Sequence, residues 1–505
     1  MQKSVIEYLV ATATKYPEKT AVQDSTGSIT FAELLRSAYV IADGIKATGL
    51  WKSPVGVFIP KGCLMVQAFA GINMSGNFYI PLDTKSPDSR ILSILNVLES
   101  EVIITDKAHE QQVKGMCDKQ VVVIEDILES QPESDVNAED YLAGQIDTDP
   151  VYSIFTSGST GTPKGVVIAH RGVIDYIDWA VSTFDVTCDA IIGNQAPFYF
   201  DNSTLDIYLM YATGATLDII PEMHFSFPAK LVDYLNEHQI TFVFWVPFAL
   251  INVANFDIFK DKKPQYLKDV LFAGEVMPNK HLNYWRKYLP NCRYANLYGP
   301  TEITVDCTFY EVDRVFADDE PLPIGVACRN SGVLILVDQQ REAGVNEEGE
   351  LCVRGSSLAL GYYNDWEKTE NAFIQNPLNK HYPETIYCTG DIVYKNERGE
   401  IMYVGRKDSQ IKHNGYRIEL GEIENAVLGS KMVDNCCAVY DFTNKKIVLY
   451  YQAPEELNLS DFRKAVSDKL PRYMLPTKYF REESLKQNGS GKIDRSYYKG
   501  LVNSK

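Results

Sequence analysis

Hydrophobic and polar positions follow two different spacings along most of the chain. Near the start, Ile6, Leu9, Val10 and Ala13 recur at helical spacing, and a strand-like stretch then leads into a second helix at 29–34. After residue 50, longer amphipathic segments separate short apolar runs, which include 55–59, 102–104, 121–124 and 242–246. Because strands buried on both faces are almost continuously apolar, this alternation predicts α/β layers with largely parallel strands.

Two later regions have a different pattern. Residues 320–410 contain short strands punctuated by Gly and Asn, which predicts a smaller β-rich subdomain. The last hundred residues mix two or three helices with short strands, as expected of a separate lobe. A polar segment divides the two regions, so we predict a core at 1–405, a hinge at 406–409 and a C-terminal lobe at 410–505.

Composition excludes several classes of function. The 505 residues include 49 Lys and Arg against 67 Asp and Glu, and the net charge of −18 argues against binding to nucleic acid or to anionic membranes. Ten scattered cysteines form no Cys-x-x-Cys pair, so neither a zinc site nor a disulfide framework is indicated. The chain has no signal pattern at its start and no apolar run of membrane-spanning length. We therefore expect a reduced, cytoplasmic enzyme or binding protein.

The most informative segment is a loop after an apolar strand at 151–155. Its nine residues, from Thr156 to Lys164, comprise only Ser, Thr, Gly, Pro and Lys. Glycines let backbone N–H groups approach phosphate oxygens, hydroxyls donate hydrogen bonds and a lysine adds charge. A flexible hairpin is the alternative, but its tip would need neither so many hydroxyls nor a lysine. The loop is not a Walker A motif, because Lys164 follows Pro163 and precedes a strand.

Six further segments accompany this loop over essentially the whole chain. They are NMSGNFYIPLD (73–83), NLYGPTE (296–302), YCTGD (387–391), GRKD (405–408), GYRIELGEIE (415–424) and GSGKIDR (489–495). Together they resemble the adenylate-forming enzymes, a family that includes acyl-CoA synthetases, luciferases and the amino-acid adenylation domains of nonribosomal peptide synthetases. The resemblance implies a large N-terminal lobe of two layered α/β subdomains with a small β-rich subdomain, and a mobile, small α+β C-terminal lobe.

The family reaction uses ATP and Mg²⁺ in two half-reactions. A carboxylate attacks the α-phosphorus and expels pyrophosphate, and a thiol then attacks the acyl-adenylate. The resemblance implies that Glu302 binds Mg²⁺, that Thr301 binds phosphate and that Asp391 accepts hydrogen bonds from the ribose, with Arg406 nearby. The remaining residues that the resemblance assigns to ATP are Thr156, Ser157, Gly158, Ser159, Thr160, Gly161, Lys164, Gly274, Glu275, Asn296, Tyr298 and Gly299.

Lys492 is the principal catalytic candidate for the first half-reaction, together with Thr301 and Glu302. Its ammonium can neutralise the attacking carboxylate and the α-phosphate as they approach each other. A lone lysine in a glycine-rich turn is usually only exposed, but the surrounding motif favours the catalytic interpretation. The resemblance further implies that the C-terminal lobe rotates about Asp408, so that a phosphopantetheine arm can enter for the second half-reaction.

Asp201 indicates which acid is activated. It resembles the family aspartate that binds a substrate α-amino group, and a buried carboxylate needs such a cation. A helix N-cap is the alternative role. The side-chain pocket predicted by the resemblance comprises Asn202, Leu205, Phe244, Leu271, Ala273, Leu297, Val305 and Asp306. The substrate side chain is then either mainly apolar, or it carries an amine or hydroxyl that contacts Asp306.

These features predict an amino-acid adenylating ligase that transfers its product to the phosphopantetheine thiol of a carrier protein acting in trans. The segment 194–201 and the compact length also resemble D-alanine-activating ligases, although Ala273 stands where we associate a cysteine with those enzymes. An acyl- or aryl-CoA ligase is a more distant alternative, against which Asp201 argues. A non-catalytic nucleotide-binding relative would not need Lys492, Glu302 and the complete loop.

Overall fold

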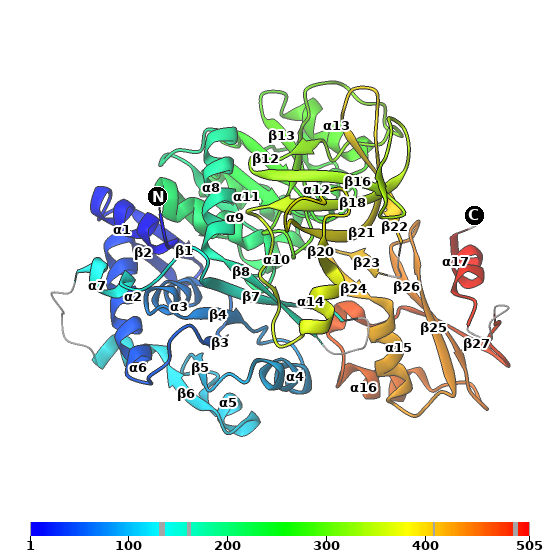
Figure 1. Ribbon diagram of the computed structural model, residues 1–505, viewed down its shortest axis with the longest axis horizontal. Helices are drawn as coiled ribbons and strands as arrows, with labels where there is room; N and C mark the ends of the chain where they lie inside the picture. Colours follow the sequence, from blue (N-terminus) through cyan, green and yellow to red (C-terminus); the bar gives the residue numbers. More distant parts are fainter. Residues whose placement is uncertain (1, 131–136, 159–162, 408–409, 488–492, 504–505) are drawn as a thin grey trace. The chain divides into compact units, whose positions relative to one another are not determined.

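The computed structural model describes residues 2–130, 137–158, 163–407, 410–487 and 493–503 (Figure 1). The chain divides into two units. The first comprises Met1–Leu82, Leu98–Ile154 and Val166–Lys407, and the second comprises Asp83–Val97, Phe155–Gly165 and Asp408–Lys505. Two segments of the second unit thus come from the range that the sequence assigned to the large lobe.

The first sheet lies in the first unit and is mostly parallel. Its order in the described part of the chain is β15-β14-β13-β12-β11-β9-β10-β1-β2, with antiparallel pairs only at the two edges. The strands are β1 (Thr20–Asp24), β2 (Gly27–Thr30), β9 (Ile191–Asn194), β10 (Thr216–Ile219), β11 (Phe242–Trp245), β12 (Asp269–Phe272), β13 (Arg293–Tyr298), β14 (Thr308–Glu311) and β15 (Val326–Ala327). All four residues of β11 are buried, as its continuous apolar run predicts.

The second sheet has the order β19-β8-β7-β4-β3-β5-β6 among the described residues. Its strands are β3 (Pro54–Phe58), β4 (Phe78–Pro81), β5 (Val102–Thr105), β6 (Gln120–Val123), β7 (Pro150–Thr156), β8 (Lys164–Ala169) and β19 (Gly361–Tyr362). The strands β3, β4, β5 and β6 pair in parallel, and β4 also pairs in parallel with β7. The loop after β7 is the predicted phosphate-binding segment.

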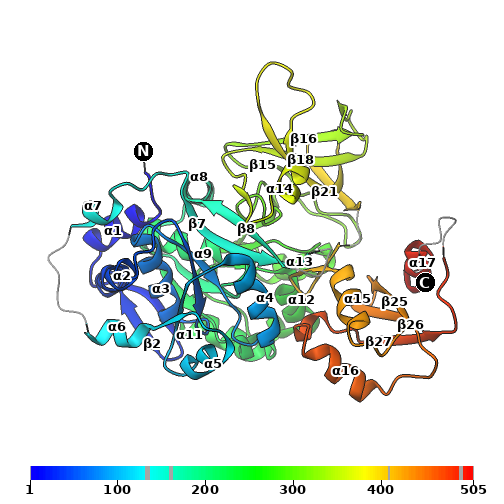
Figure 2. The ribbon, with the colours of Figure 1, turned by 60° about the horizontal axis from the view of Figure 1, so that its bottom comes forward.

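A third, antiparallel sheet forms the β-rich part of the first unit. Within the described ranges it has the order β17-β16-β18-β21-β20, and β22 also pairs with β21. Figure 2 shows β16, β18 and β21 side by side, as their register requires. The strands are β16 (Ser331–Val337), β17 (Arg341–Glu342), β18 (Gly349–Gly355), β20 (Phe373–Gln375), β21 (Thr385–Lys395) and β22 (Ile401–Arg406).

Helices of the first unit cover the two mostly parallel sheets. The helix α2 begins with a capping box, in which Thr30 Oγ1 accepts a hydrogen bond from Glu33 N and Glu33 Oε2 accepts one from Thr30 N. Its apolar face packs against α3, which is buried along nearly all its length. The helices are α1 (Ile6–Lys15), α2 (Phe31–Lys46), α3 (Cys63–Met74), α5 (Glu110–Met116), α6 (Ile124–Ser130), α7 (Ala138–Leu142), α8 (His170–Phe184), α9 (Asn202–Thr213), α10 (Glu222–Phe225), α11 (Pro228–Glu237), α12 (Pro247–Asn255), α13 (Asn279–Tyr288) and α14 (Trp366–Ala372).

The second unit is a small α+β body with its own core. Its C-terminal part contains β23 (Gln410–His413), β24 (Tyr416–Glu419), α15 (Leu420–Leu428), β25 (Asn435–Asp441), β26 (Lys446–Gln452), α16 (Leu459–Ser467), β27 (Lys478–Glu482) and α17 (Arg495–Asn503). The strands β25, β26 and β27 form one sheet, against which α15 packs (Figure 1). The helix α4 (Asp88–Leu98) falls almost wholly in this unit.

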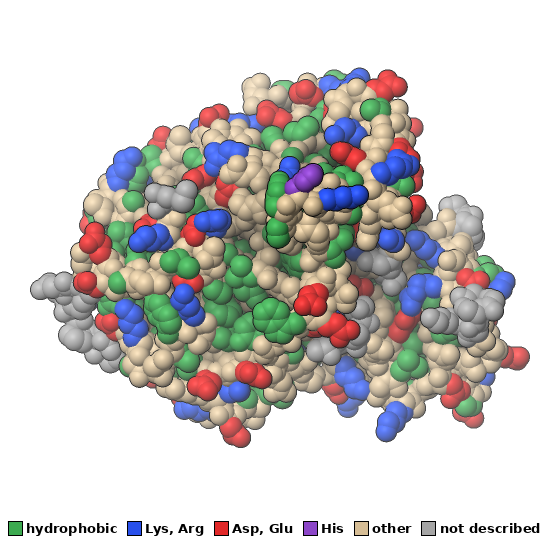
Figure 3. Space-filling model, viewed as in Figure 1, with side chains coloured by type: hydrophobic (Ala, Val, Ile, Leu, Met, Phe, Trp, Pro, Cys, Tyr) green, Lys and Arg blue, Asp and Glu red, His purple; other side chains and the backbone are tan. Residues whose placement is uncertain are grey.

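These layers confirm the fold class that the sequence predicts. On the face in Figure 3, Lys and Arg side chains are interspersed with Asp and Glu side chains. None of the helices in the described part of the chain combines the length and apolarity needed to cross a bilayer.

Candidate active site

Asp391 lies in the first unit at the centre of a group that we call the ribose corner, comprising Tyr298, Thr389, Asp391 and Arg406. The Asp391 side chain is 2% exposed, and its Oδ1 accepts a hydrogen bond from Arg406 Nη1 at 2.9 Å. The Tyr298 hydroxyl donates to Asp391 Oδ2. The Asp391 N–H donates to Thr389 Oγ1 at 3.0 Å, and Arg406 Nη2 donates to Thr389 O at 3.2 Å. The sequence assigned Asp391, Arg406 and Tyr298 to ATP, and the structure brings them together.

The charges of the ribose corner follow from its burial. Burial and the adjacent Asp391 charge raise the pKa of Tyr298 well above its usual value, so this phenol stays protonated and keeps its donor role. Arg406 is only 10% exposed and supplies the positive charge that a buried carboxylate needs. The corner thus presents a fixed acceptor group, as a ribose diol requires.

Thr301 and Glu302 lie directly after β13. Gly299 allows the turn, because an added Cβ there would lie 2.3 Å from Val305 O and 2.6 Å from Asp306 Cα. The Glu302 side chain is buried, and its Oε1 accepts a hydrogen bond from the Tyr362 hydroxyl at 2.8 Å. Sequence reasoning missed Tyr362, because a lone tyrosine 60 residues away carries no motif.

The donor set around Glu302 fits a magnesium ion that is shared with a nucleotide. Mg²⁺ prefers oxygen ligands, and it is commonly held by one or two carboxylates together with phosphate oxygens and waters. The described residues contain no group of three or more His, Cys, Asp and Glu side chains that could hold a metal by themselves. Glu302 would therefore share such an ion with phosphate oxygens and waters, and would not complete a site made of described protein side chains alone.

Three more residues that the sequence assigned to ATP, Asn296, Gly274 and Glu275, differ in their surroundings. Asn296 is buried in β13, and its Nδ2 donates to Pro323 O at 2.8 Å. Gly274 has a φ of +94°, which side chains with a Cβ rarely adopt, and it follows β12. Glu275 comes next and is half-buried. The Asn296 amide thus holds the backbone at Pro323, and the contacts of all three residues with ATP stay predictions.

The apolar residues predicted to line the substrate pocket lie together in the first unit. They come from α9, β11, β12, β13 and the turns after β12 and β13, and all belong to one buried cluster: Leu205, Phe244, Leu271, Ala273, Leu297 and Val305. Their neighbour Asn202 begins α9, and its Nδ2 is buried without a hydrogen-bond partner among the described residues. The structure therefore assembles this group from four elements that are far apart in sequence.

Asp201 and Asp306 differ in their surroundings. Asp201 precedes α9, but its side chain makes no capping hydrogen bond, so the N-cap alternative has no support. Asp306 is 2% exposed, and its Oδ2 accepts a hydrogen bond from the Tyr176 hydroxyl at 2.6 Å. Burial, Asp306 and the more distant Asp201 raise the pKa of Tyr176 well above its usual value. Tyr176 on α8 is therefore a member of this site that sequence reasoning missed.

A further carboxylate lies one turn beyond Asn202 on α9. Asp206 is fully buried, and its Oδ2 accepts a hydrogen bond from Asn194 Nδ2 at 2.7 Å. Its Oδ1 has no hydrogen-bond partner in the described part of the chain. Burial raises the pKa of Asp206 to about 7, although the Asn194 hydrogen bond and the Lys61 charge oppose the rise.

The described ends of the phosphate loop belong to the second unit. Ser157 Oγ donates a hydrogen bond to Arg417 O at 2.9 Å and accepts one from Glu419 N at 3.1 Å. Its hydroxyl is therefore bonded to two backbone groups near the end of β24. Thr156 Oγ1 is buried and has no such partner among the described residues. Lys164 begins β8, and Gly158 ends the described segment before residue 163. Ser159, Thr160 and Gly161 lie outside the described residues.

The same unit contains a buried ion pair that sequence reasoning did not find. Arg90 Nη1 on α4 donates to Glu422 Oε1 on α15, and the two side chains are 10% and 5% exposed. Burial raises the pKa of Glu422 although Arg90 and the Gly158 N–H oppose the rise. Two other predicted residues of this unit, Lys492 and Asp408, lie outside the described residues, and their roles remain predictions.

Comparisons with known proteins identify the family. The family described as AMP-binding enzyme matches residues 9–363. An L-proline–(L-prolyl-carrier protein) ligase of Pseudomonas fluorescens is 31% identical over 507 residues, covering 98% of each chain. A D-alanine–D-alanyl carrier protein ligase of Bacillus licheniformis is 30% identical over 511 residues, covering 98% of this chain and 99% of the relative.

Solved structures share the fold. The adenylation domain AlmE of Vibrio cholerae, in complex with glycyl-adenosine-5′-phosphate, matches with a TM-score of 0.86 and 21% identity, covering 100% of this chain and 98% of that one. An artificially fused adenylation–PCP di-domain from Klebsiella oxytoca matches with a TM-score of 0.82 and 20% identity, over 95% and 94% of the two chains. At these identities the likeness establishes the fold alone. The full-length sequence matches and the family match from residue 9 to residue 363 establish that this chain belongs to the AMP-binding enzymes.

Proposed function

We propose that the protein activates an amino acid with ATP, releases pyrophosphate and transfers the aminoacyl group to the phosphopantetheine thiol of a carrier protein acting in trans. The observation that carries this proposal is Asp201. It immediately precedes α9, the helix that carries Leu205 of the apolar cluster, and its side chain makes no capping hydrogen bond to that helix. An amino acid brings an ammonium group with which a carboxylate at this position can pair, whereas a fatty or aryl acid brings none. Two carrier-protein ligases among the relatives give independent support.

The first half-reaction brings two anions together, so most of the catalysis must come from positioning and from cations. The ribose corner orients the nucleotide through Asp391, and Thr301 contacts the phosphates. Glu302 would hold Mg²⁺, which neutralises charge on the phosphate oxygens when it is bound. Lys492 is assigned to the attacking carboxylate and the α-phosphate, as the motif implies.

A mainly apolar substrate side chain fits the pocket better than a cationic one. Six of its predicted lining residues are apolar, and the hydroxyl of Tyr176 already donates to Asp306. A substrate amine or hydroxyl that meets Asp306 would have to compete with this hydrogen bond. The ten cysteines are all free thiols, which supports a reducing compartment such as the cytoplasm as the place of the reaction.

D-alanine activation is a second candidate, because a relative of 30% identity is named for that activity. Ala273 argues against it, since we associate a cysteine with this position in those enzymes. Both candidates share the first half-reaction and differ in the acid and in the carrier.

Pyrophosphate exchange tests the proposal directly. We expect the exchange of pyrophosphate into ATP to depend on one amino acid or a few, when the L and D enantiomers of all amino acids are tested. Activity only with D-alanine would favour the second candidate, and activity only with fatty or aryl acids would overturn both. Transfer of the product to free CoA and to a phosphopantetheinylated carrier distinguishes a CoA ligase from a carrier ligase.

Two variants then test the assigned roles. Lys492→Ala should reduce exchange by about 100-fold or more, as removal of one transition-state charge does. If it exchanged as fast as the unaltered protein, the assignment of Lys492 would be wrong. Asp306→Ala should leave the preferred amino acid unchanged if the side chain is apolar, and it should abolish that preference if Asp306 contacts a polar group.

A further inference from the structure

Two cysteines face each other across neighbouring strands of the third sheet. Cys352 on β18 and Cys388 on β21 are direct partners in the antiparallel register. The Cys352 thiol donates a hydrogen bond to Cys388 Sγ at 3.4 Å. Opposed residues of an antiparallel pair have Cα atoms about 4.5 to 5.5 Å apart, within the range that a disulfide spans. The backbone is therefore already arranged for a cross-strand disulfide.

This pair lies at the base of the bulge that presents Asp391. The regular register ends at Cys352 with Cys388 and resumes at Glu350 with Ile392. The three residues 389–391 are therefore accommodated opposite Leu351 alone. A bulge of this kind redirects a side chain, and here the side chain is that of Asp391. A covalent bond between Cys352 and Cys388 would act on the strand position next to Thr389, whose hydroxyl and carbonyl both belong to the ribose corner.

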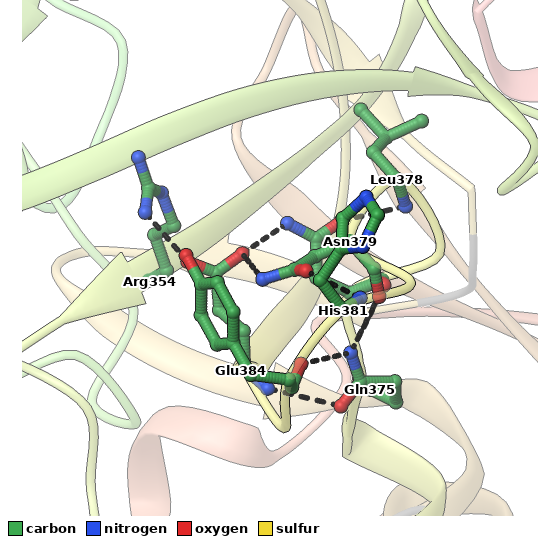
Figure 4. Close-up of polar contacts among 8 residues, drawn as sticks. Arg354, Gln375, Leu378, Asn379, His381 and Glu384 are labelled. Carbon is green, nitrogen blue, oxygen red and sulfur yellow. Dashed lines mark hydrogen bonds and ion pairs between the residues drawn. The ribbon is translucent and has the colours of Figure 1, made fainter.

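Polar contacts link the same two strands on either side of the cysteines. Figure 4 shows Arg354, which follows Cys352 on β18, pairing with Glu384 at 2.6 Å, just before β21 begins. Asn376 Nδ2 donates to the other Glu384 oxygen at 2.6 Å. On the other side, Glu350 accepts a hydrogen bond from Gly390 N, within the bulge, at 3.1 Å and lies 3.6 Å from Nζ of Lys407, which follows β22. Because the Arg354–Glu384 pair links the strands on one side of the cysteines and the bulge begins on the other, we expect the bulge to absorb a change at the cysteines.

The two thiols are suited to different steps of disulfide formation. Cys388 is partly exposed, whereas Cys352 is buried. The hydrogen bond from Cys352 lowers the pKa of Cys388, and the nearby Lys407 charge acts in the same direction, while burial opposes both. Cys388 is thus the thiol that reacts first with an oxidant from solvent, and Cys352 is the thiol that then attacks the oxidised Cys388 to form the disulfide.

We propose that Cys352 and Cys388 form a redox-active dithiol, which hydrogen peroxide converts to a cross-strand disulfide that weakens ATP binding at the adjacent ribose corner. The Cys388 thiolate attacks one peroxide oxygen and becomes a sulfenic acid, and the O–O bond breaks to release hydroxide, which takes up a proton to give water. The Cys352 sulfur then attacks the Cys388 sulfur, loses its proton and expels a second water. Two thiols and one peroxide thus give one disulfide and two waters. The effect on ATP rests on the proposed function, whereas formation of the disulfide does not.

Peptide mapping tests the disulfide itself. The full chain is treated with hydrogen peroxide, free thiols are alkylated, and the digest is searched by mass spectrometry for a peptide linking Cys352 to Cys388. We expect the linked peptide in the unaltered protein and in Cys117→Ser, a partly exposed cysteine on another element. Cys388→Ser should lack it, and dithiothreitol should remove it. Full alkylation of both cysteines after peroxide treatment, or a Cys388 that stops at sulfinic acid, would overturn the proposal.

The shift in melting temperature caused by ATP measures the consequence without relying on catalysis. We expect the oxidised protein to bind ATP about tenfold more weakly than the reduced protein, a change equivalent to one charge-assisted hydrogen bond. Cys388→Ser should bind ATP equally before and after peroxide treatment. Equal ATP affinity of the reduced and disulfide-linked proteins would refute the coupling. If the reduced protein showed no ATP-dependent shift, the proposed function would fail while the peptide map still decided the disulfide.

Discussion

The ribose corner and the start of α9 both bury a carboxylate in the first unit, but with opposite electrostatic results. Asp391 lies against the guanidinium of Arg406 and also accepts from Tyr298. Asp206 accepts from the neutral amide of Asn194, and burial raises its pKa to about 7. Burial disfavours a charged carboxylate unless a cation lies in contact with it. Two carboxylates of similar burial thus differ in their partners, since one forms an ion pair and the other has, among the described residues, only a neutral amide in hydrogen-bond contact.

This difference matches what each region is proposed to bind. A ribose needs a charged acceptor group in one orientation, and the Arg406 and Tyr298 contacts hold Asp391 in place. An apolar amino-acid side chain needs surroundings with little charge, and the raised pKa of Asp206 reduces the charge on α9, the helix that carries Asn202 and Leu205 of the predicted pocket. Tyr176 serves a similar purpose at Asp306, since its hydroxyl donates to the buried carboxylate without adding charge.

The largest expected effect is that of Asp391→Asn. It removes the charge that compensates Arg406, which is itself only 10% exposed. Loss of one partner from a buried ion pair costs about 3 to 5 kcal/mol, so we expect a fall of that size in the free energy of unfolding by urea. ATP binding should weaken as well, because the ribose loses its acceptor. The exposed Asp434→Asn is the matched control. A fall in the free energy of unfolding below about 1 kcal/mol would mean that the Asp391–Arg406 pair contributes no more than a surface ion pair. The contrast drawn between Asp391 and Asp206 would then be wrong.

Asp206 should make the free energy of unfolding depend on pH. Its folded pKa of about 7 exceeds the ordinary value of 3.8, so the folded state holds the proton more tightly. This contribution is fully present below pH 3.8 and is lost as the pH rises to about 7. The difference corresponds to about 4 kcal/mol over the whole window. Urea unfolding from pH 4 to pH 8 should show this fall in the unaltered protein and a flatter curve in Asp206→Asn.

The Asp206 comparison has a simple negative outcome. If the free energy of unfolding varied with pH in the same way in the unaltered protein and in Asp206→Asn, Asp206 would titrate as an ordinary carboxylate. Asp434→Asn should run parallel to the unaltered protein in either case, because Asp434 is exposed.

Tyr176→Phe should have a smaller effect. The variant keeps the ring but removes the hydroxyl that donates to Asp306 at 2.6 Å. Leaving a buried acceptor without its donor costs about 1 to 3 kcal/mol, which is the expected fall in unfolding free energy. With this donor gone, a substrate that carries an amine or hydroxyl should gain activity relative to an apolar one in pyrophosphate exchange. No change in the relative rates would show that Tyr176 does not influence selectivity.

The smallest effects are expected in the phosphate loop, where Ser157 and Thr156 form a matched pair. Ser157→Ala removes both bonds to β24 and should cost about 1 kcal/mol or somewhat more, since Glu419 N loses its acceptor. Thr156→Val removes a hydroxyl that has no partner in the described part of the chain, so stability should stay within about 0.5 kcal/mol. The Michaelis constant for ATP should rise in Thr156→Val if its hydroxyl serves the nucleotide. Equal losses of stability in the two variants would contradict this distinction.

Much of the site could be predicted because its chemistry is local in sequence. Hydroxyls, glycines and a lysine must be close along the chain to form a phosphate loop, and the apolar run of β11 marks a buried strand by itself. The motif YCTGD likewise places Asp391 at the third sheet. The adenylating family is confirmed from these residues and from the family match.

The residues that were missed act through contacts distant in sequence. Tyr176 reaches Asp306 across 130 residues, Tyr362 reaches Glu302 across 60, and Arg90 reaches Glu422 across 332. A single tyrosine or arginine has no spacing that distinguishes it from an ordinary surface residue. The contact between Cys352 and Cys388 could not be predicted from the sequence either, because 36 residues separate them and they share no motif.

The amino-acid order alone thus specified the layers, the family and the chemical type of each reacting group, since hydrophobic spacing and short motifs depend only on neighbours along the chain. The folded arrangement decided which carboxylates are charged, which hydroxyls are already engaged and which thiols meet. Those properties depend on desolvation and on partners brought close by strand register and helix packing. Asp391 and Asp206 are the same residue type, and only their neighbours in the fold give one an ion pair with Arg406 and the other a pKa of about 7.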